Sequence, residues 1–342
     1  MKKAALITGI SGQDGAYLSQ KLIKDGYTVF GVSRDPSPQT NWRLRHLGLI
    51  DHPDLRIFKC DLADPQQTNE LISDLKPAEV YNLASHSFVS DSQNFAYKTA
   101  MVSGVAVLNL LEAISKNSPS SKFLQAGSSE LFGNAEQSPQ NEQSKFRPRN
   151  VYASAKLFAH SAVLNYRDNL GIFAANAILY NHESPLRDVQ FVTRRISQAV
   201  AQISKNNLQK LEIGNLSATR DWGYAPEYAR ALRQLLNHVE PDTFVIATGR
   251  ATTVREFVRL AFLIVGVEVV FEGLGKQEKG LDAKSGRELV SINSQFFRDA
   301  EPVPLLGDPS KASEILGWKA ETSVEEIVRE MVEADVARID SN

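Results

Sequence analysis

The feature that most limits how this chain can fold is a glycine-rich turn that follows an apolar run near its start. Ala4 to Thr8 reads as a buried β-strand, and glycines follow at a spacing of three at Gly9, Gly12 and Gly15. In a strand–turn–helix unit, such glycines let backbone amide groups at the helix N-terminus approach a pyrophosphate. Glycine spacing alone is weak evidence, but its place before a helical pattern predicts a dinucleotide site. The cofactor-binding residues predicted in this turn are Gly9, Ile10, Ser11, Gly12, Gln13, Asp14 and Gly15.

The rest of the chain alternates short β-branched runs with segments of helical period, which is typical of a parallel α/β sheet. Further strands are predicted at Thr28–Val32, Leu55–Lys59, Glu79–Leu83, Phe123–Ala126 and Phe173–Leu179. Helices are predicted at Tyr17–Lys24, Gln66–Leu75, Val102–Lys116, Ser154–Asn169, Ala225–Leu236, Val254–Val265 and Val324–Ala334. This order predicts a doubly wound parallel sheet, the Rossmann fold, with a second, smaller α+β domain interleaved with it.

The expected domain boundaries follow from where the regular alternation ends. Residues 1–180 are expected to form the Rossmann domain, to which parts of 216–248 return. Residues 181–215 and 249–342 are expected to form the substrate domain. The segment from Glu272 to Arg287 is rich in Gly, Lys and Glu and has no apolar period, so a mobile loop that serves as a lid is expected there.

Composition argues against several classes of function. The formal net charge is -2, without a basic face, so neither nucleic acid nor a membrane surface is an expected partner. No stretch reads as a membrane helix, and the apolar run at Ala4–Ile7 is too short for a signal peptide. Cys60 is the only cysteine, and the six histidines show no metal-ligand spacing, so no metal and a cytoplasmic location are expected.

The end of the second predicted strand bears on the choice of dinucleotide. An NAD site usually places an Asp or Glu there to hold the ribose 2'-hydroxyl, whereas this chain has Ser33 followed by Arg34. Arg34 therefore favours NADP. In the alternative, Arg34 is a solvated loop residue and Asp35 holds the ribose 2'-hydroxyl of NAD. The ends of the third and fourth strands would line the adenine, ribose and phosphate, through Asp61, Leu62, Leu83, Ala84 and Ser85.

Four side chains near the fifth strand form a candidate catalytic group. Tyr152 and Lys156 are four residues apart on a predicted helix, so they share one face, and the ammonium is expected to lower the pKa of the tyrosine and make it a base. Ser128 and Glu130 are two apart in what is expected to be extended chain and would face the same side. Tyr152 with a hydroxyl suffices to oxidise an alcohol, whereas the added carboxylate indicates removal of a carbon-bound proton, as in an elimination.

Together these segments resemble the extended short-chain dehydrogenase/reductase family, and longer strings resemble its GDP-mannose 4,6-dehydratase branch over nearly the whole chain. The strings are GISGQDG (9–15), QAGSSELFG (125–133), NHESP (181–185), FVTR (191–194), GNL (214–216), RDWG (220–223), IATG (246–249) and LLGDP (305–309). The chain departs from the branch pattern at several positions, some of which touch the sugar pocket. They are Gly127 and Ser128 for the usual Ser-Thr pair, His86 for a glutamine, Arg195 for a lysine and Asp299 for a proline.

The resemblance implies conversion of GDP-mannose to GDP-4-keto-6-deoxymannose with no net redox change. Tyr152, helped by Lys156, would take the hydroxyl proton at sugar carbon 4 as hydride passes to NADP, and Ser128 would hydrogen-bond that oxygen. Glu130 would then remove the carbon 5 proton, water would leave carbon 6, and the hydride would return there. The resemblance places Tyr152, Lys156, His182 and Arg187 beside NADP, and it places Ser87, Asn181, Arg195, Arg220, Arg298 and Glu301 around the GDP-sugar.

Other readings remain open at this stage. The departures in the sugar pocket leave GDP-mannoheptose as an alternative substrate. A sugar-nucleotide reductase or epimerase, which would not need Glu130, and a non-catalytic dinucleotide sensor are less favoured. Asp35 stands where the branch has a second arginine that supports tetramers, so a homodimer is expected, with a homotetramer as the alternative.

Overall fold

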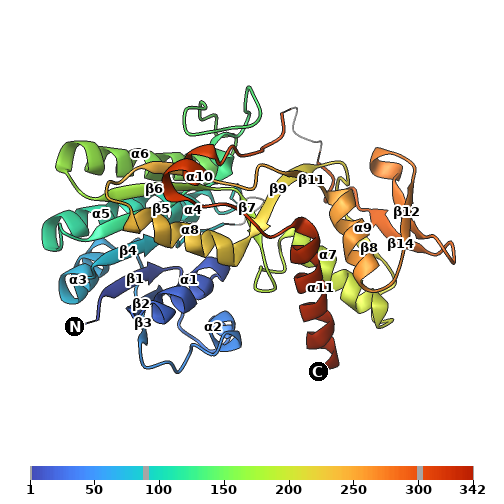
Figure 1. Cartoon of the computed structure of the whole chain (residues 1–342), viewed down its shortest axis with the longest axis horizontal. Coiled ribbons are helices and arrows are strands. Elements are labelled where there is room, and N and C mark those ends of the chain that lie inside the picture. The colour runs from blue at the N-terminus through green and yellow to red at the C-terminus, as the bar shows by residue number, and fades with distance from the viewer. Residues whose placement is uncertain (1, 88–91, 299–302, 342) are drawn as a thin grey trace.

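A seven-stranded parallel sheet forms the larger part of the molecule (Figure 1), in the order β10-β6-β5-β4-β1-β2-β3. The structure, a computed structural model of the whole chain, describes residues 2–87, 92–298 and 303–341. The strands of this sheet are β1 (Ala4–Thr8), β2 (Thr28–Ser33), β3 (Leu55–Lys59), β4 (Glu79–Asn82), β5 (Lys122–Ala126), β6 (Ala174–Leu179) and β10 (Thr243–Ile246). All neighbouring pairs are parallel, which confirms the predicted doubly wound fold.

Helices cover both faces of this sheet and bury a separate apolar cluster on each. The first face carries α1 (Gln13–Lys24), α2 (Trp42–His46), α8 (Ala225–Asn237) and α10 (Ser310–Leu316). The second carries α3 (Pro65–Leu75), α5 (Ala106–Asn117) and α6 (Val151–Leu170). Leu22 and Leu232 are fully buried on the first face, and Ile72 and Leu110 on the second. Because both faces are covered, β1 and β6 are buried on both sides and consist almost entirely of apolar residues.

One continuous helical stretch is apolar enough by composition to cross a membrane, which the sequence analysis did not anticipate. It covers Ala96–Asn117 and consists of α4 (Ala96–Ala100), a π-helical segment (Met101–Val105) and α5. More than half of its most apolar window is buried inside the fold, and Val107 and Leu111 are fully buried in the cluster shared with α3 and α6. Its apolar character is therefore that of a core helix of the Rossmann layer.

The smaller part of the molecule contains two short sheets and three helices (Figure 1). One sheet has the order β11-β9-β7, from β7 (Asn181–Glu183), β9 (Thr219–Tyr224) and β11 (Ala251–Thr253). The other has the order β12-β13-β14-β8, from β8 (Leu211–Ile213), β12 (Val269–Glu272), β13 (Lys279–Asp282) and β14 (Glu288–Ile292). The helices are α7 (Val192–Ser204), α9 (Val254–Ile264) and α11 (Val324–Asp340), which share a cluster containing Phe257, Phe262 and Met331.

The expectation of a loop from Glu272 to Arg287 is wrong for the middle of the segment, because β13 forms there; the residues on either side of β13 connect it to β12 and β14. β12 pairs with β13, and β13 pairs with β14. Glu278, just before β13, is 4% exposed and accepts a hydrogen bond from Arg255 Nε at 2.6 Å. Gly280 lies close between the side chains of Val269 and Val290, where a larger residue would clash. The apolar contacts come from the neighbouring strands, so the segment itself shows no apolar period.

Asp221 joins the two parts of the molecule at the edge of the large sheet. This carboxylate is 1% exposed and accepts hydrogen bonds from Thr248 N at 2.9 Å, Gly249 N at 3.0 Å and Gly307 N at 3.3 Å. Trp318 packs in the same apolar cluster as α1 and α8, although it follows the substrate segments in sequence. The chain thus crosses repeatedly between the two parts, and the exact division into domains stays a prediction.

Candidate active site

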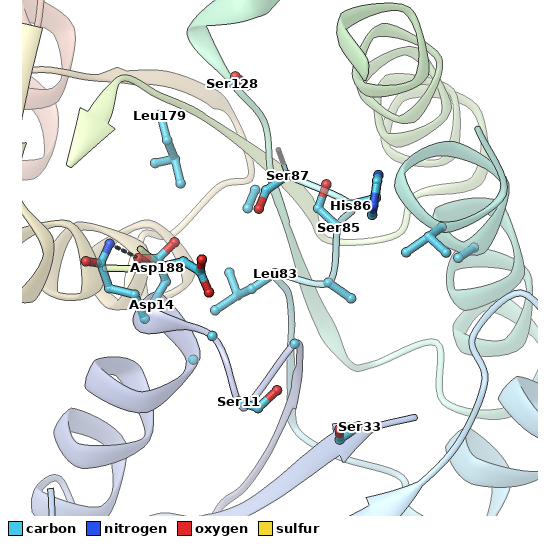
Figure 2. A pocket seen from close by; sticks show the side chains of 18 of the residues that line it. Ser11, Asp14, Ser33, Leu83, Ser85, His86, Ser87, Ser128, Leu179 and Asp188 are labelled. Atoms are coloured by element: carbon cyan, nitrogen blue, oxygen red, sulfur yellow. Dashed lines mark hydrogen bonds between the residues drawn. The ribbon is translucent and has the colours of Figure 1, made fainter. Parts of the chain in front are cut away.

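A cavity of about 600 Å³ opens at the carboxyl ends of the parallel strands. Its wall consists of the segments that follow β1 to β6, together with the chain around β7. Figure 2 shows the loop after β4, with Leu83, Ser85 and Ser87, between the glycine-rich turn and the loop that carries Ser128. Open α/β sheets bind ligands at this edge, because the carboxyl ends of neighbouring parallel strands meet there.

The glycine-rich turn has the backbone geometry that a phosphate site needs. Gly9 has φ of +69°, and a Cβ there would lie 2.8 Å from the backbone nitrogen of Ala84. A Cβ on Gly15 would lie 2.5 Å from the carbonyl oxygen of Gly9, so this residue lets α1 approach the turn closely. No described side chain caps the N-terminus of α1, where anions bind to backbone amides. Ile10 is the exception among the predicted turn residues, since its side chain is fully buried in the core and does not line the cavity.

At the end of β2, the structure distinguishes the roles open to Arg34 and Asp35. The Asp35 carboxylate accepts hydrogen bonds from Ser37 N at 3.1 Å and from Thr40 Oγ1 at 3.0 Å. These contacts, that of Thr40 first, lower the pKa of Asp35 and turn its carboxylate toward its own loop. Arg34 is exposed and lines the cavity. The alternative in which Asp35 binds a ribose hydroxyl is therefore disfavoured.

Tyr152 and Lys156 project from the first turns of α6 into the cavity, but the predicted effect of the lysine on the tyrosine is not found. Burial raises the pKa of Tyr152 to about 12, which outweighs the opposing hydrogen bond with Ser128. Lys156 Nζ lies 5.8 Å from the centre of the tyrosine ring and donates a hydrogen bond to Ala126 O at 2.8 Å. Burial also lowers the pKa of Lys156 to about 8, so its charge is itself costly to maintain.

Ser128 and Glu130 both line the cavity, although not through the extended chain that was expected. Ser128 is extended, but a 3₁₀ turn (Ser129–Leu131) begins directly after it, and the Ser128 Oγ accepts a hydrogen bond from Glu130 N at 3.2 Å. The turn carries the Glu130 carboxylate toward the start of α6. There, its Oε2 accepts a hydrogen bond from Asn150 Nδ2 at 3.0 Å and lies 3.9 Å from Arg149 Nε.

His182 and Asp14 form an ion pair on the opposite wall of the cavity. His182 Nε2 lies 2.9 Å from Asp14 Oδ1, its Nδ1 lies 2.7 Å from Tyr180 O, and its ring stacks on Tyr228. The pKa of Asp14 is lowered to about 2, because the attraction of His182 and a hydrogen bond from it outweigh burial. The pKa of His182 is raised, because the same two interactions outweigh its burial.

The predicted residues fall into two groups by position. All the predicted cofactor-binding residues except Ile10 line this one cavity, as do the catalytic group, Ser87 and Asn181. Arg195, Arg220 and Arg298 are not among its lining residues. The Arg195 guanidinium lies over the ring of Phe296 at 4.2 Å, in the smaller part of the molecule. Glu301 lies outside the described residues.

Arg43 is a cavity residue that the sequence analysis missed. It is 9% exposed, and its guanidinium donates to Leu186 O at 2.7 Å and to Ser11 O at 3.1 Å. It therefore ties the glycine-rich turn to the loop after β7. It also pairs with the Asp188 carboxylate at 3.3 Å, and Leu186 and Asp188 lie 143 and 145 positions away, so no spacing in the sequence could mark it. Thr40, Asp188, Gln190 and Phe191 also line the cavity and were missed.

Comparison with known proteins agrees with this geometry. The profile of the family described as GDP-mannose 4,6 dehydratase matches residues 6–331. A GDP-mannose 4,6 dehydratase of Cricetulus griseus is 42% identical over 100% of this chain and 93% of its own length. A GDP-mannose 4,6-dehydratase of Sinorhizobium fredii is 42% identical over 98% of this chain and 97% of its own length.

Solved structures show the same fold at low sequence identity. RMD of Pseudomonas aeruginosa, complexed with NADPH, superposes with a TM-score of 0.78 at 22% identity, and the match covers 98% of this chain and 100% of that one. A dTDP-glucose 4,6-dehydratase of Bacillus anthracis, in complex with NAD, gives a TM-score of 0.80 at 15% identity, with 99% and 98% covered. Across the described residues, no three His, Cys, Asp or Glu side chains are grouped so as to hold a metal ion.

Proposed function

The chain belongs to the GDP-mannose 4,6-dehydratase family, and on that basis we propose that it converts GDP-mannose to GDP-4-keto-6-deoxymannose with NADP as its cofactor. The observation that carries this proposal is that Glu130 lines the same cavity as Tyr152, Lys156 and the glycine-rich turn. An oxidoreductase of this fold needs the tyrosine and the lysine. Only an elimination also needs a carboxylate beside them, to remove a proton from carbon.

The residues of the cavity fit NADP. The uncapped N-terminus of α1 suits a pyrophosphate, and the exposed guanidinium of Arg34 suits a 2'-phosphate. Asp35, which would repel that phosphate, is engaged by Ser37 and Thr40. When bound, NADP supplies an acceptor for the hydride of carbon 4 and returns it to carbon 6 in the same cycle. Arg187 fits beside it, since its guanidinium is held at 3.1 Å from Glu183 and lies over Phe191.

Tyr152 is the group proposed to take the hydroxyl proton at sugar carbon 4. Its high pKa means that the phenol keeps its proton in the protein without ligands, so the proposal requires that the positive charge of Lys156 favours the phenolate once the sugar and NADP are bound. Ser128 and Tyr152 are within hydrogen-bonding reach of each other, since their hydrogen bond acts on the pKa of the tyrosine. A sugar oxygen placed between the two hydroxyls would thus be contacted by both as its charge develops.

Glu130 is the group proposed to act in the elimination. The ketone at carbon 4 makes the carbon 5 proton acidic, and the carboxylate takes that proton. The electron pair of the broken C–H bond forms the double bond between carbons 5 and 6, and the carbon 6 hydroxyl leaves with a proton as water. Glu130, now protonated, supplies that proton and becomes a carboxylate again. When hydride returns to carbon 6, carbon 5 takes up a proton, and the proton that Tyr152 took from the carbon 4 hydroxyl balances it.

The nucleotide end of the substrate is proposed to bind in the smaller part of the molecule. Arg195, Arg220 and Arg298 offer guanidinium groups for the diphosphate and base. Arg195 is held flat against Phe296, and the carbonyl of Arg298 accepts a hydrogen bond from Asn215 Nδ2 at 3.0 Å. Asn181, at the start of β7, lies where the cavity meets this part. Glu301 is proposed to join this group.

A homodimer in the cytoplasm is proposed as the working state of the protein. Phe95 and Tyr97, at α4, and Phe158, on α6, are 50%, 80% and 47% exposed. Exposed aromatic residues on neighbouring helices are typical of a surface that a second copy covers. Light scattering of the purified protein tests this, and a monomer or a tetramer would contradict it.

The proposed reaction is tested by incubating the purified protein separately with GDP-mannose and with GDP-mannoheptose and following the products by mass spectrometry. Loss of one water from GDP-mannose is expected, with no lasting change in nicotinamide absorbance. A lasting consumption of NADPH would instead identify a reductase. Loss of water from GDP-mannoheptose but not from GDP-mannose would show that the heptose is the substrate and that the reaction is still an elimination.

A further inference from the structure

The side chain of Asn150 contacts two parts of the catalytic group at once. Its Oδ1 accepts a hydrogen bond from Ala153 N at 2.8 Å and so caps the N-terminus of α6, the helix that carries Tyr152 and Lys156. Its Nδ2 donates a hydrogen bond to Glu130 Oε2 at 3.0 Å. A single amide group therefore links the carboxylate on the 3₁₀ turn to the helix of the tyrosine and the lysine.

The cap fixes which way this amide faces. The backbone N–H of Ala153 needs an acceptor, so the carbonyl oxygen of the Asn150 side chain must face the helix. The NH₂ group is then left for Glu130, which can only accept when it is ionised. A serine, threonine or aspartate could cap the helix equally well, but none of them would offer a side-chain N–H to the carboxylate.

We propose that Asn150 is a positioning residue that holds the Glu130 carboxylate against the catalytic helix for the elimination step; this inference rests on the proposed function. Both recorded contacts of that carboxylate, with Asn150 and with Arg149, involve Oε2. Oε1 is thus the oxygen that remains to take the carbon 5 proton. Arg149 Nε lies 3.9 Å from Oε2 of Glu130. Its charge offsets that of the carboxylate, but this distance is too long for a hydrogen bond that would fix the Glu130 side chain.

The first test compares Asn150→Ser and Asn150→Asp with the wild-type protein. Asn, Ser and Asp are comparable N-caps, so the three proteins should unfold at similar temperatures. Asn150→Ser replaces the amide donor to Glu130 by the hydroxyl of a shorter side chain, and Asn150→Asp removes the donor and places a second carboxylate beside Glu130. Water loss is expected to slow by about 10- to 100-fold in Asn150→Ser, the scale of a small misplacement of a reacting group. It should slow further in Asn150→Asp.

The readout separates positioning of Glu130 from a general effect on α6. If Asn150 acts through Glu130, rapid mixing of the variants with GDP-mannose should show reduced nicotinamide accumulating, because oxidation at carbon 4 continues while elimination is slow. If it only caps the helix, oxidation and elimination should slow together, which would overturn the proposal. Ser323→Ala serves as the matched control, since it removes the cap of the remote helix α11 and should leave the ratio of the two steps unchanged.

A second measurement does not depend on the reaction. The side-chain amide resonances of Asn150, assigned by their loss in Asn150→Ser, should shift strongly in Glu130→Gln if the hydrogen bond exists in solution. Unchanged resonances would refute the contact and with it the proposal. If the wild-type protein releases no water from GDP-mannose, the proposed function fails, and these resonances still decide whether Asn150 holds Glu130.

Discussion

His182 is hydrogen-bonded through both ring nitrogens to acceptors, and one of them is the Asp14 carboxylate at 2.9 Å. A neutral imidazole has only one N–H, so this arrangement requires the doubly protonated ring. The raised pKa of His182 agrees with that requirement. The pair joins β7 to the first turn of α1, and it lies in the cavity wall where the pyrophosphate is proposed to bind.

The first prediction is that the coupling between His182 and Asp14 depends on pH. The stabilisation from His182, whose pKa is raised above 6.5, is fully present below 6.5 and is lost as the pH rises through the folded-state value. That from Asp14 is present above 3.8 and is lost as the pH falls toward about 2. A double-mutant cycle with Asp14→Asn and His182→Gln should give about 1.5 to 3 kcal/mol at about pH 5.5. The same cycle, measured by urea unfolding at about pH 9, should give a clearly smaller coupling energy. An equal coupling energy at the two pH values would contradict a doubly protonated His182.

The second prediction concerns Tyr152→Phe, which removes the hydroxyl and barely changes the shape of the side chain. Water loss from GDP-mannose should become undetectable, and no reduced nicotinamide should form, because the proton of carbon 4 has no acceptor. NADP affinity, measured by calorimetry, should stay within a few-fold of the wild type. Tyr166→Phe, on the same helix but outside the cavity wall, is the control. Residual turnover near the wild-type rate would place the base elsewhere.

The third prediction concerns Glu130→Gln, which should stall the reaction after oxidation. Reduced nicotinamide should build up, and exchange of the carbon 5 hydrogen with heavy water should fall by roughly 10²- to 10⁴-fold, as is typical when a general base is lost. Glu136→Gln is a matched control, because Glu136 pairs with Arg147 and Lys145 and does not line the cavity. Hydrogen exchange at the wild-type rate in Glu130→Gln would remove this residue from the mechanism.

The fourth prediction is that Arg34→Ala changes the preference for the cofactor rather than the fold. Loss of a charge-assisted contact to the 2'-phosphate should weaken NADP binding by about 10- to 100-fold, with little effect on NAD. Arg56→Ala, an exposed arginine on the neighbouring strand β3, should change neither affinity. An equal loss for both dinucleotides would show that Arg34 supports the site in another way.

The main sheet and the composition of the cavity wall could be predicted because both depend on local signals. Strands such as Ala4–Thr8 are short and apolar, and their carboxyl ends meet at one edge in any parallel sheet. The Tyr152 and Lys156 pair follows from helical spacing, and the NADP preference follows from Arg34 at the end of β2. These inferences need no knowledge of which distant segments touch.

The features that escaped prediction all depend on distant contacts. Arg43 is held in the cavity wall by its hydrogen bond to Leu186 O, a contact that no local pattern can indicate. The strand β13, within Glu272–Arg287, is stabilised by neighbours such as Val269 and Val290, so its own sequence looks like a loop. The pKa of Tyr152 could not be inferred from its spacing to Lys156, because the degree of burial decides its direction.

The hydrogen bonds of Asp221 have a consequence for building chimaeras of this protein with its relatives. The carboxylate lies in the string RDWG and receives N–H groups from Thr248 and Gly249 in the string IATG and from Gly307 in the string LLGDP. If RDWG is exchanged alone and the geometry shifts, buried donors in the other two strings lose their partner, and if IATG or LLGDP is exchanged alone, the buried carboxylate loses donors. A transplanted sugar-binding half should therefore fold only when the three strings are inherited from the same parent, whichever parent supplies the catalytic side chains.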